Sequence, residues 1–320
     1  MKAWQCAAAG GQDDLALLEV PAPLPRPGEV LVRVRAAALN FSDLLMLRGV
    51  YQVRPPPPFV PGQELAGIVA GDGARWRRGE RVAGKVLWGG FAEEVAVRED
   101  MLIGLPDDVP FEEGAALPVI WPTAWIALHD RARLAAGETV LIHAGAGGVG
   151  SAALQLARAA GARVFATAGG PDKAALCQEL GAAAVFDTGS GPWLEPLMRL
   201  TDGRGVDVVF DPVGGETTDQ SVKALARNGR LLIVGFAGGA IPAIKANRLL
   251  LKNASALGVY WSHDTDAPLV EHALAEVLAL RAAGSIRLMV SQRHAFADLR
   301  KALVDLHERR TVGKSVVTLP

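Results

Sequence analysis

The sequence is poor in cysteine and has almost no net charge. Cys6 and Cys177 are the only cysteines in 320 residues, and they lie outside any Cys-x-x-Cys or Cys/His cluster. This argues against a structural zinc lobe and a disulfide framework, and favours a reducing compartment. Lysine and arginine total 33 against 34 aspartates and glutamates, with no basic run. We therefore expect a small-molecule partner and neither nucleic acid nor a membrane surface.

The sequence also lacks the signs of an export signal. The apolar stretch after Lys2 is interrupted by "GGQDD" at 10–14, too early for a secretory segment, so a cytoplasmic protein is expected. Residues 139–157 contain no Asp, Glu, Lys or Arg, and a membrane span is the alternative interpretation of that stretch. Its glycines, together with His143, Ser151 and Gln155, disfavour a span.

Two patterns divide the chain. The first hundred residues form short apolar segments between turn-forming clusters, among them 30–39, 65–70, 81–87 and 91–97, as in a compact antiparallel barrel. One short helix is expected at 41–49. From about residue 122, apolar strands alternate with glycine turns and helices, as in 139–161 and 163–181. This alternation predicts an α/β fold with a doubly wound parallel sheet covered on both faces.

Glycines 145, 147 and 150 have the spacing of a dinucleotide-binding turn. They directly follow an apolar strand and open a predicted helix, which is the context that the motif requires. The first glycine allows a tight turn, the second lets the backbone approach the pyrophosphate, and the third allows the helix to pack closely on the strand. We expect Gly145, Gly147, Gly148, Val149 and Gly150 to bind the cofactor at the helix N-terminus. A glycine turn without a ligand is the alternative.

The acid that usually binds the ribose hydroxyl of NAD is missing after the second strand, which ends "FATAGGPDK". An acid there would repel the additional phosphate of NADP. Small residues at 167–170, including Gly169, leave room for a phosphate, and Lys173 supplies a positive charge. The sequence therefore favours NADPH, although Asp172 weakens the positive field. A solvated surface lysine is the alternative for Lys173.

Taken together, these segments resemble the medium-chain dehydrogenase/reductase superfamily, and within it the zinc-free quinone oxidoreductase (zeta-crystallin-like) family. The motifs that carry the resemblance extend over essentially the whole chain. They are "ALNFSDLLMLRGVY", "PPFVPGQELAG", "GGFAEEVAV", "HAGAGGVG", "FDPVGGE", "GRLLIVGFAGG", "ANRLLLKN" and "GKSVVTL".

The resemblance implies a GroES-like antiparallel barrel domain over 1–121 and 263–320, and an inserted Rossmann domain over 122–262, with the active site in the cleft between them. Dimers are common in the family, often through edge strands of the Rossmann sheet. A homodimer through "ASALGVYW" at 254–261 is therefore expected.

The resemblance also implies that catalytic zinc is absent. Zinc-dependent relatives have a cysteine where this chain has Asn40, and Gly-His-Glu where it has Gly62-Gln63-Glu64. Neither amide is a usual zinc ligand. Without a Lewis acid, the expected acceptor is a quinone or an enone, in which hydride addition leaves delocalised negative charge.

By motif, Asn40 would hold the cofactor or substrate near the nicotinamide, although it also stands where it can cap the helix that follows. Tyr51 matches a family tyrosine that orients or protonates the acceptor; an ordinary packed aromatic is the alternative. These two residues are the catalytic candidates. Thr123 matches a contact of the nicotinamide end, with helix capping as its alternative.

Other cofactor contacts are implied by the resemblance alone. They are Gly235, Phe236 and Ala237 beside the carboxamide, Tyr260 and Trp261 at the same end, and Arg309 or Lys314 at the cofactor phosphates. Relatives that favour NADPH often have a tyrosine where this chain has Thr188, so selectivity is expected to be weaker here. The leading function is quinone reduction by NADPH. Reduction of 2-alkenals or other enones is the alternative, and a low-turnover NADPH-binding protein is a further one.

Overall fold

The computed structural model describes residues 1–8 and 10–320 and divides them into two compact units. The first unit comprises Met1–Val119 and Leu288–Pro320, and the second comprises Ile120–Arg287. The second unit continues beyond the predicted boundary at residue 262, because helix α9 (His263–Ala282) packs against α3 (Ile120–Trp125) of the same unit. Val270, Leu274 and Val277 are buried on α9.

The first unit is built around antiparallel strands. Its main sheet has the order β14-β15-β3-β4-β5-β7, with β6 also paired to β3, and β1 pairs with β2 separately. The strands are β1 (Lys2–Cys6), β2 (Leu15–Glu19), β3 (Glu29–Ala38), β4 (Glu64–Val69), β5 (Arg81–Lys85), β6 (Glu94–Arg98), β7 (Leu102–Gly104), β14 (Gln292–Ala295) and β15 (Ser315–Thr318). This arrangement is the expected GroES-like domain.

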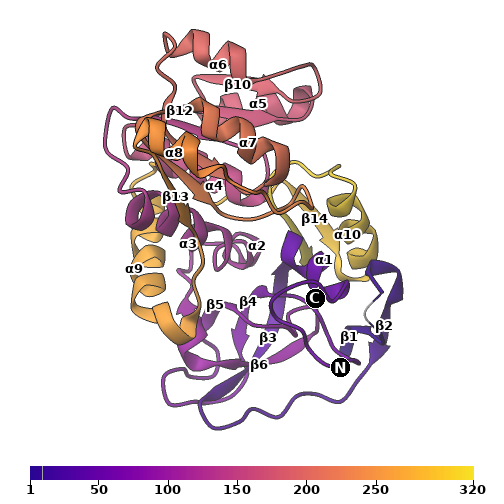
Figure 1. The fold of residues 1–320 in the computed structure, drawn as a ribbon. Helices are drawn as coiled ribbons and strands as arrows, with labels where there is room; N and C mark the ends of the chain where they lie inside the picture. The colour runs from indigo at the N-terminus through magenta and orange to yellow at the C-terminus, as the bar shows by residue number, and fades with distance from the viewer. Residues whose placement is uncertain (9) are drawn as a thin grey trace. The chain divides into compact units, whose positions relative to one another are not determined.

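The last strand of the chain lies inside this sheet. β15 pairs antiparallel with β3, with Val317 opposite Ala37, and Trp4 Nε1 donates to the Phe296 carbonyl oxygen at 2.8 Å. Helices α1 (Phe41–Leu47) and α10 (Leu299–His307) pack together, as the indigo and yellow ribbons in Figure 1 show, and α2 (Phe111–Ala115) lies against β3 and β4. The two ends of the chain thus share one hydrophobic core.

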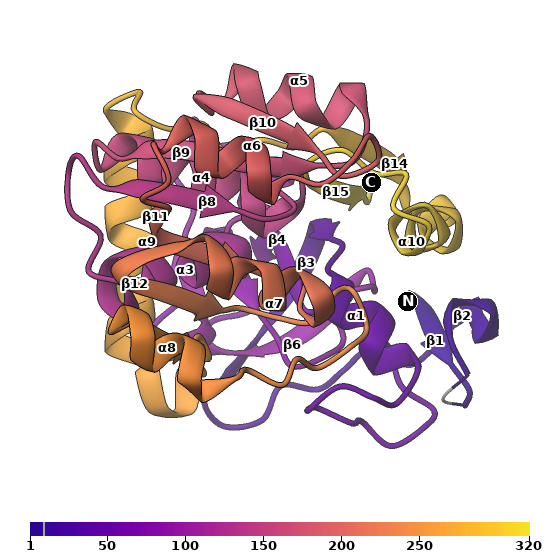
Figure 2. The same ribbon diagram turned by 45° about the horizontal axis from the view of Figure 1, so that its top comes forward.

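The second unit contains a parallel sheet with the order β10-β9-β8-β11-β12-β13. This is the strand order of dinucleotide-binding folds, in which the order reverses between the first and fourth strands of the unit. Figure 2 shows β10, β9, β8, β11 and β12 stacked in this order. The strands are β8 (Thr139–Ile142), β9 (Arg163–Ala168), β10 (Ala184–Asp187), β11 (Val206–Asp211), β12 (Leu225–Ile233) and β13 (Ser255–Gly258).

Helices connect these strands. They are α4 (Gly148–Ala159), α5 (Pro171–Glu179), α6 (Leu194–Leu200), α7 (Gly215–Ala224) and α8 (Ala246–Lys252). α7 leads directly into a strand, because residues from Leu225 onward already belong to β12. No helix within residues 1–8 and 10–320 is long and apolar enough to cross a membrane.

Candidate functional site

The glycine turn lies where the sequence predicts it. β8 ends at Ile142, α4 begins at Gly148, and Gly147 is the N-cap residue with a φ of −81°. The left-handed position in the turn is occupied by Ala144, with a φ of 50°. The tight bend attributed to Gly145 is therefore made by its neighbour, and Gly145 has a different role.

That role is close packing. A Cβ on Gly145 would lie 2.9 Å from Ala166 Cβ on β9 and 3.0 Å from Cys177 Sγ on α5. A Cβ on Gly150 would overlap the Ala144 carbonyl oxygen, so α4 can approach the turn only with glycine here. At Gly147 the nearest atom would be that oxygen, at 3.2 Å. Gly145 and Gly150 thus serve the protein's own packing, and Gly147 leaves backbone open at the helix N-terminus, as a pyrophosphate site requires.

A buried chain of hydrogen bonds supports the turn. The Ala144 N–H donates to Thr167 Oγ1 at 3.3 Å, and Thr167 Oγ1 lies 3.0 Å from His143 Nδ1. His143 Nε2 lies 2.8 Å from Ser221 Oγ, which donates to the Thr217 carbonyl oxygen. Since Ser221 uses its proton there, the Nε2 atom of His143 carries a hydrogen and Nδ1 accepts from Thr167. Burial lowers the pKa of His143 to about 4, which keeps the ring neutral.

The end of β9 is held by a carboxylate from the next strand. Asp187 Oδ1, at the end of β10, accepts the N–H groups of Gly170 and Gly189, each at 2.9 Å. Gly170 has a φ of 90° and is the N-cap residue of α5. Gly169 precedes it, and Lys173 follows in the first turn of α5. Thr188 Oγ1 donates to the Ala168 carbonyl oxygen at 3.3 Å.

Two residues expected at the nicotinamide end meet in the second unit. Trp261 Nε1 donates to Thr123 Oγ1 at 2.9 Å across 138 positions of sequence. Thr123 lies inside α3 rather than at its start, so the capping interpretation is not supported. Trp261 is buried, whereas the side chain of Tyr260 is 66% exposed.

The loop after β12 carries the other predicted nicotinamide contacts. Phe236 is 37% exposed and Gly235 is half-buried. The Ala237 N–H donates to the Pro212 carbonyl oxygen at 3.0 Å, and the Phe236 carbonyl oxygen accepts from Gly239 at 2.8 Å. The N–H of Ala237 is therefore engaged within the protein, which leaves the Ala237 carbonyl and the Phe236 N–H as candidate carboxamide partners.

A second candidate centre lies in the first unit, around Asn40. Asn40 Nδ2 donates to Glu64 Oε1 at 2.9 Å, and Asn40 Oδ1 accepts from Lys314 Nζ at 2.7 Å. The Lys314 ammonium also donates to the Leu39 carbonyl oxygen at 2.9 Å and forms an ion pair with Glu64. Glu64 Oε2 accepts the Val119 N–H at 3.0 Å. These contacts fix which way the Asn40 amide points.

Lys314 therefore differs from its predicted role at the cofactor phosphates. Its side chain is 2% exposed, and its three donors meet Leu39, Asn40 and Glu64. An ammonium has no further donor for a phosphate. Arg309, the other residue expected there, lies just after α10 with a φ of 58°.

Asp43 completes the centre. It is buried in the first turn of α1, and its Oδ2 accepts the Asn40 N–H at 2.8 Å. Its Oδ1 is buried without a hydrogen-bond partner among the described residues. Burial, together with the Glu64 charge, raises the pKa of Asp43 to about 7, against the opposing effects of the Asn40 N–H and Lys314. Asn40 is itself the N-cap residue of α1, and its role toward the cofactor or substrate stays a prediction.

Tyr51 lies after α1, half-buried, and its ring packs against the hydrophobic core of the first unit. Its carbonyl oxygen accepts from Arg54 Nε at 3.1 Å. The packed-aromatic interpretation thus describes its ring, and the acid role of its phenol stays a prediction.

Comparison with known proteins identifies the family. Residues 26–107 match the alcohol dehydrogenase GroES-like domain, and residues 148–279 match the family described as zinc-binding dehydrogenase. The chain is 36% identical over 310 residues to quinone oxidoreductase-like protein 2 of Bos taurus, covering 95% of this chain and 89% of that protein. It is 35% identical to a quinone oxidoreductase of Pseudomonas aeruginosa, over 98% of both chains. The chain belongs to the zinc-free quinone oxidoreductase family of medium-chain dehydrogenases/reductases.

A solved structure agrees with this assignment. A mycobacterial protein in complex with NADPH superposes with a TM-score of 0.93, at 32% identity and over 100% of both chains. The GroES-like domain and the Rossmann domain are thus both confirmed as fold predictions.

The donor set of this family member does not fit the zinc that one matched family description implies. The candidate positions hold Asn40, Gln63 and Glu64, and the Glu64 carboxylate is already paired with Lys314. Gln63 Oε1 accepts from Ser42 Oγ at 2.9 Å. Within residues 1–8 and 10–320, no group of three or more His, Cys, Asp and Glu side chains is placed to hold a metal ion. The cation between Asn40 and Glu64 is an ammonium.

Sequence reasoning missed four residues of these sites, namely Asp43, Glu64, Asp187 and Lys314 in its observed role. The Asp43 position was visible as a helix-start signal, and Glu64 was visible inside the Gly-Gln-Glu segment. No local pattern marks the pairing of Lys314 with Asn40, or that of Asp187 with Gly170.

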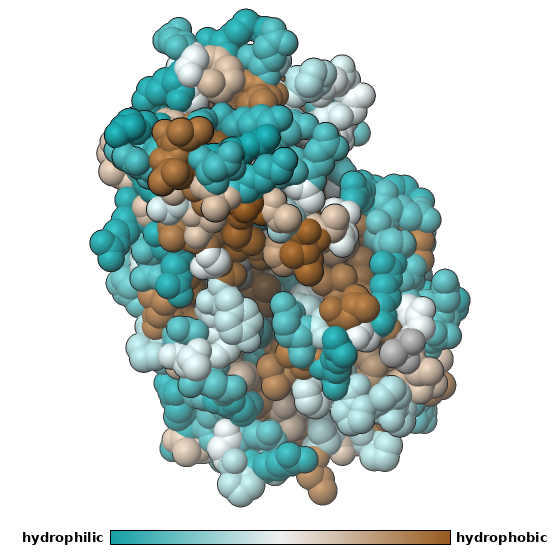
Figure 3. Space-filling view, in the orientation of Figure 1, coloured by the Kyte–Doolittle hydropathy of each residue, from teal (hydrophilic) through white to brown (hydrophobic). Residues whose placement is uncertain are grey.

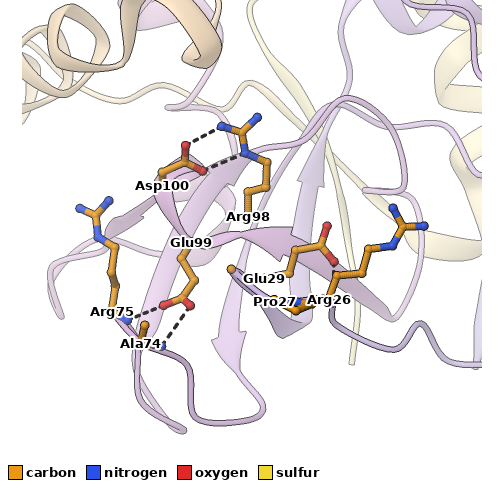
Figure 4. A pocket seen from close by; sticks show the side chains of 9 residues that line it. Arg26, Pro27, Glu29, Ala74, Arg75, Arg98, Glu99 and Asp100 are labelled. Atoms are coloured by element: carbon orange, nitrogen blue, oxygen red, sulfur yellow. Dashed lines mark hydrogen bonds and ion pairs between the residues drawn. The ribbon is translucent and has the colours of Figure 1, made fainter.

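A cavity of about 560 Å³ lies elsewhere in the first unit. Figure 4 shows Arg98 paired with Asp100, and Glu99 accepting the backbone N–H groups of Ala74 and Arg75. Three arginines and three carboxylates line the cavity, Arg26 and Glu29 among them. The cavity thus has no net charge to select an ion.

Proposed function

We propose that this protein reduces quinones with NADPH and without a metal ion. The observation that carries the proposal is the glycine turn of α4 at the point where the strand order reverses, with Lys173 rather than an acid after β9. Ligands of such folds bind outside the carboxyl ends of the strands at this point. The NADPH complex of the mycobacterial relative and the quinone oxidoreductase names of the curated relatives support the same assignment.

Different groups of the chain bind the two ends of the cofactor. The N–H groups at the start of α4, beginning at Gly148, hold the pyrophosphate, and Lys173 attracts the ribose phosphate. The Thr123–Trp261 pair and the loop at Gly235–Ala237 hold the nicotinamide end. When bound, NADPH supplies the hydride.

The Asn40 centre supports a metal-free reaction. Glu64 and Lys314 set both ends of the Asn40 amide, and a fixed amide orients a ligand without the entropy loss of a mobile one. A side-chain amide polarises a carbonyl less than zinc does, so the suitable acceptor is one that takes hydride readily. Quinones have this property, and Tyr51 is the proposed proton donor to the acceptor oxygen.

The alternative acceptors are 2-alkenals and other enones, which accept hydride by the same electronic route. A steady-state screen that follows NADPH absorbance with 1,4-benzoquinone, a 2-alkenal and a saturated ketone separates the two. We expect the quinone to give the highest kcat/KM and the ketone to give none. Activity confined to saturated alcohols or ketones contradicts the proposal.

A low-turnover binding protein is distinguished by a single-turnover measurement. Mixing excess enzyme carrying NADPH with a quinone oxidises the nucleotide within one turnover if the protein is a reductase. A protein that only binds the nucleotide leaves it reduced. The Lys173→Ala variant is the control for cofactor recognition, with a rise in the Kd of NADPH and an unchanged Kd of NADH.

We also propose a homodimer through the edge of the second unit. β13 ends the sheet order, and neighbouring α8 exposes Leu250 and Leu251 by 75% and 76%. Figure 3 shows brown, hydrophobic atoms gathered over α8. Light scattering after gel filtration tests this: Leu251→Glu is expected to give monomers, and Leu24→Glu, at an 88% exposed site of the other unit, is expected to leave dimers. A monomeric wild type contradicts it.

A further inference from the structure

In the second unit, an acid from β10 lies beside the end of β9, where the sequence of β9 itself supplies no acid. In dinucleotide-binding folds the group that recognises the 2′ position of the adenosine ribose lies after the second strand of the motif. In this chain that place is the end of β9, at Ala168–Gly170. β10 pairs in parallel with β9, and Asp187 stands opposite Ala168 in the register.

The carboxylate of Asp187 is bonded to this segment. Its Oδ1 accepts from Gly170 and from Gly189 at 2.9 Å. These two N–H groups lower the pKa of Asp187, because they stabilise the charged form. A negative charge therefore stands one hydrogen bond away from the N-cap residue of α5.

A helix N-terminus is normally a favourable place for a phosphate, because its N–H groups and dipole attract negative charge. At α5 the N–H of the N-cap residue, Gly170, already donates a hydrogen bond to the Asp187 carboxylate. A phosphate that approaches Gly169 and Gly170 meets the attraction of Lys173 and the repulsion of Asp187 together. A ribose hydroxyl meets no such repulsion, and a carboxylate can accept its hydrogen bond.

We propose that Asp187 is a specificity-determining residue whose negative charge disfavours a phosphate on the adenosine ribose and so restrains the preference for NADPH over NADH. The inference rests on the proposed function, since it concerns the same cofactor site. Lys173 and Asp187 act in opposite directions, and removing each charge shifts the ratio of the two dissociation constants in opposite senses.

The test is a set of binding measurements by titration calorimetry, independent of turnover. Asp187→Asn keeps an acceptor oxygen for Gly170 and Gly189 and removes only the charge. We expect it to tighten NADPH relative to NADH by about tenfold, an effect that shrinks at high salt as a charge effect must. Asp187→Ala also removes the acceptor, so it weakens both nucleotides. Asp219→Asn, at an exposed site on α7, is the matched control and leaves the ratio unchanged.

The outcomes are distinct. A wild type that binds neither nucleotide overturns the proposed function and this inference with it. A wild type that binds both, with an unchanged ratio in folded Asp187→Asn, overturns this inference alone. If Asp187→Asn does not fold, Asp187→Ser supplies an uncharged acceptor, and the same criterion applies to it.

Discussion

Lys314 Nζ and Asn40 Oδ1 lie 2.7 Å apart although 274 positions separate them in sequence. The same ammonium pairs with Glu64, so a cation from the segment before β15 holds together Asn40 at the start of α1 and Glu64 on β4. Removing any one partner of such a buried ion pair leaves an uncompensated charge in the interior, which destabilises the fold.

Replacing Lys314 is therefore expected to be severe. Lys314→Met leaves the buried Glu64 carboxylate with only the Asn40 amide and the Val119 N–H as partners, and we expect a loss of about 3–5 kcal/mol in the free energy of unfolding. Urea denaturation measures it. Lys301→Met, which breaks a pair with Asp305 at a 73% exposed side chain, is the control, with an expected change below about 1 kcal/mol. Equal changes in both variants contradict the buried-pair argument.

The pH dependence of stability is expected to carry the signature of Asp43. The carboxyl of the unfolded chain titrates near its ordinary pKa of 3.8, whereas the folded one titrates at about 7. Between these values the folded chain binds the extra proton, so this group's contribution falls as pH rises, by up to about 4 kcal/mol. Asp43→Asn removes that dependence.

Thermal unfolding from about pH 5 to about pH 8 measures the difference. The stability of wild type relative to Asp43→Asn is expected to decline up to about pH 7, the pKa of the folded carboxyl, and to level off above it. Asp202→Asn in a turn of the second unit is the control. Parallel curves for wild type and Asp43→Asn would show that the pKa of this carboxyl is not raised.

Gly150 is expected to be needed for the packing of α4, and Gly147 for nucleotide binding. Gly150→Ala places a methyl group into the Ala144 carbonyl, so both stability and NADPH binding fall, with a loss of about 1–3 kcal/mol. Gly147→Ala meets that oxygen at 3.2 Å with an ordinary φ of −81°. It is expected to leave stability nearly unchanged and to raise the Kd of NADPH by about tenfold or more, because the backbone approach is blocked. Calorimetric melting and a nucleotide titration measure the two effects. Unchanged nucleotide binding in Gly147→Ala would count against the pyrophosphate site.

The hydrogen-bond chain below the turn is tested at Thr167. Thr167→Val leaves the Ala144 N–H and His143 Nδ1 without their hydroxyl partner, at a cost of about 1–3 kcal/mol. Thr167→Ser keeps the hydroxyl and is expected to remain within about 1 kcal/mol of wild type. Chemical denaturation compares the two; a serine variant as unstable as the valine variant would point to the lost methyl group instead.

The helices and strands could be predicted from the sequence better than the contacts between them. The turn at Gly145–Gly150 was predictable, because strand, glycines and helix are consecutive. The burial of Lys314 was not predictable, since "GKSVV" is equally compatible with a surface lysine, and only the pairing of β15 with β3 brings it to Asn40. Asp187 was missed for the same reason, because the register of β10 on β9 decides which residue neighbours Gly170.

The pairing of β15 with β3 has a consequence for biosynthesis. Residues 120–287 leave the ribosome before residues 288–320. All strands of the Rossmann unit are therefore synthesised before β14 and β15 of the GroES-like sheet. Until that late segment arrives, Glu64 has no ammonium to neutralise it. The buried ion pair of the GroES-like unit therefore forms only after the residues of the inserted Rossmann unit have been synthesised.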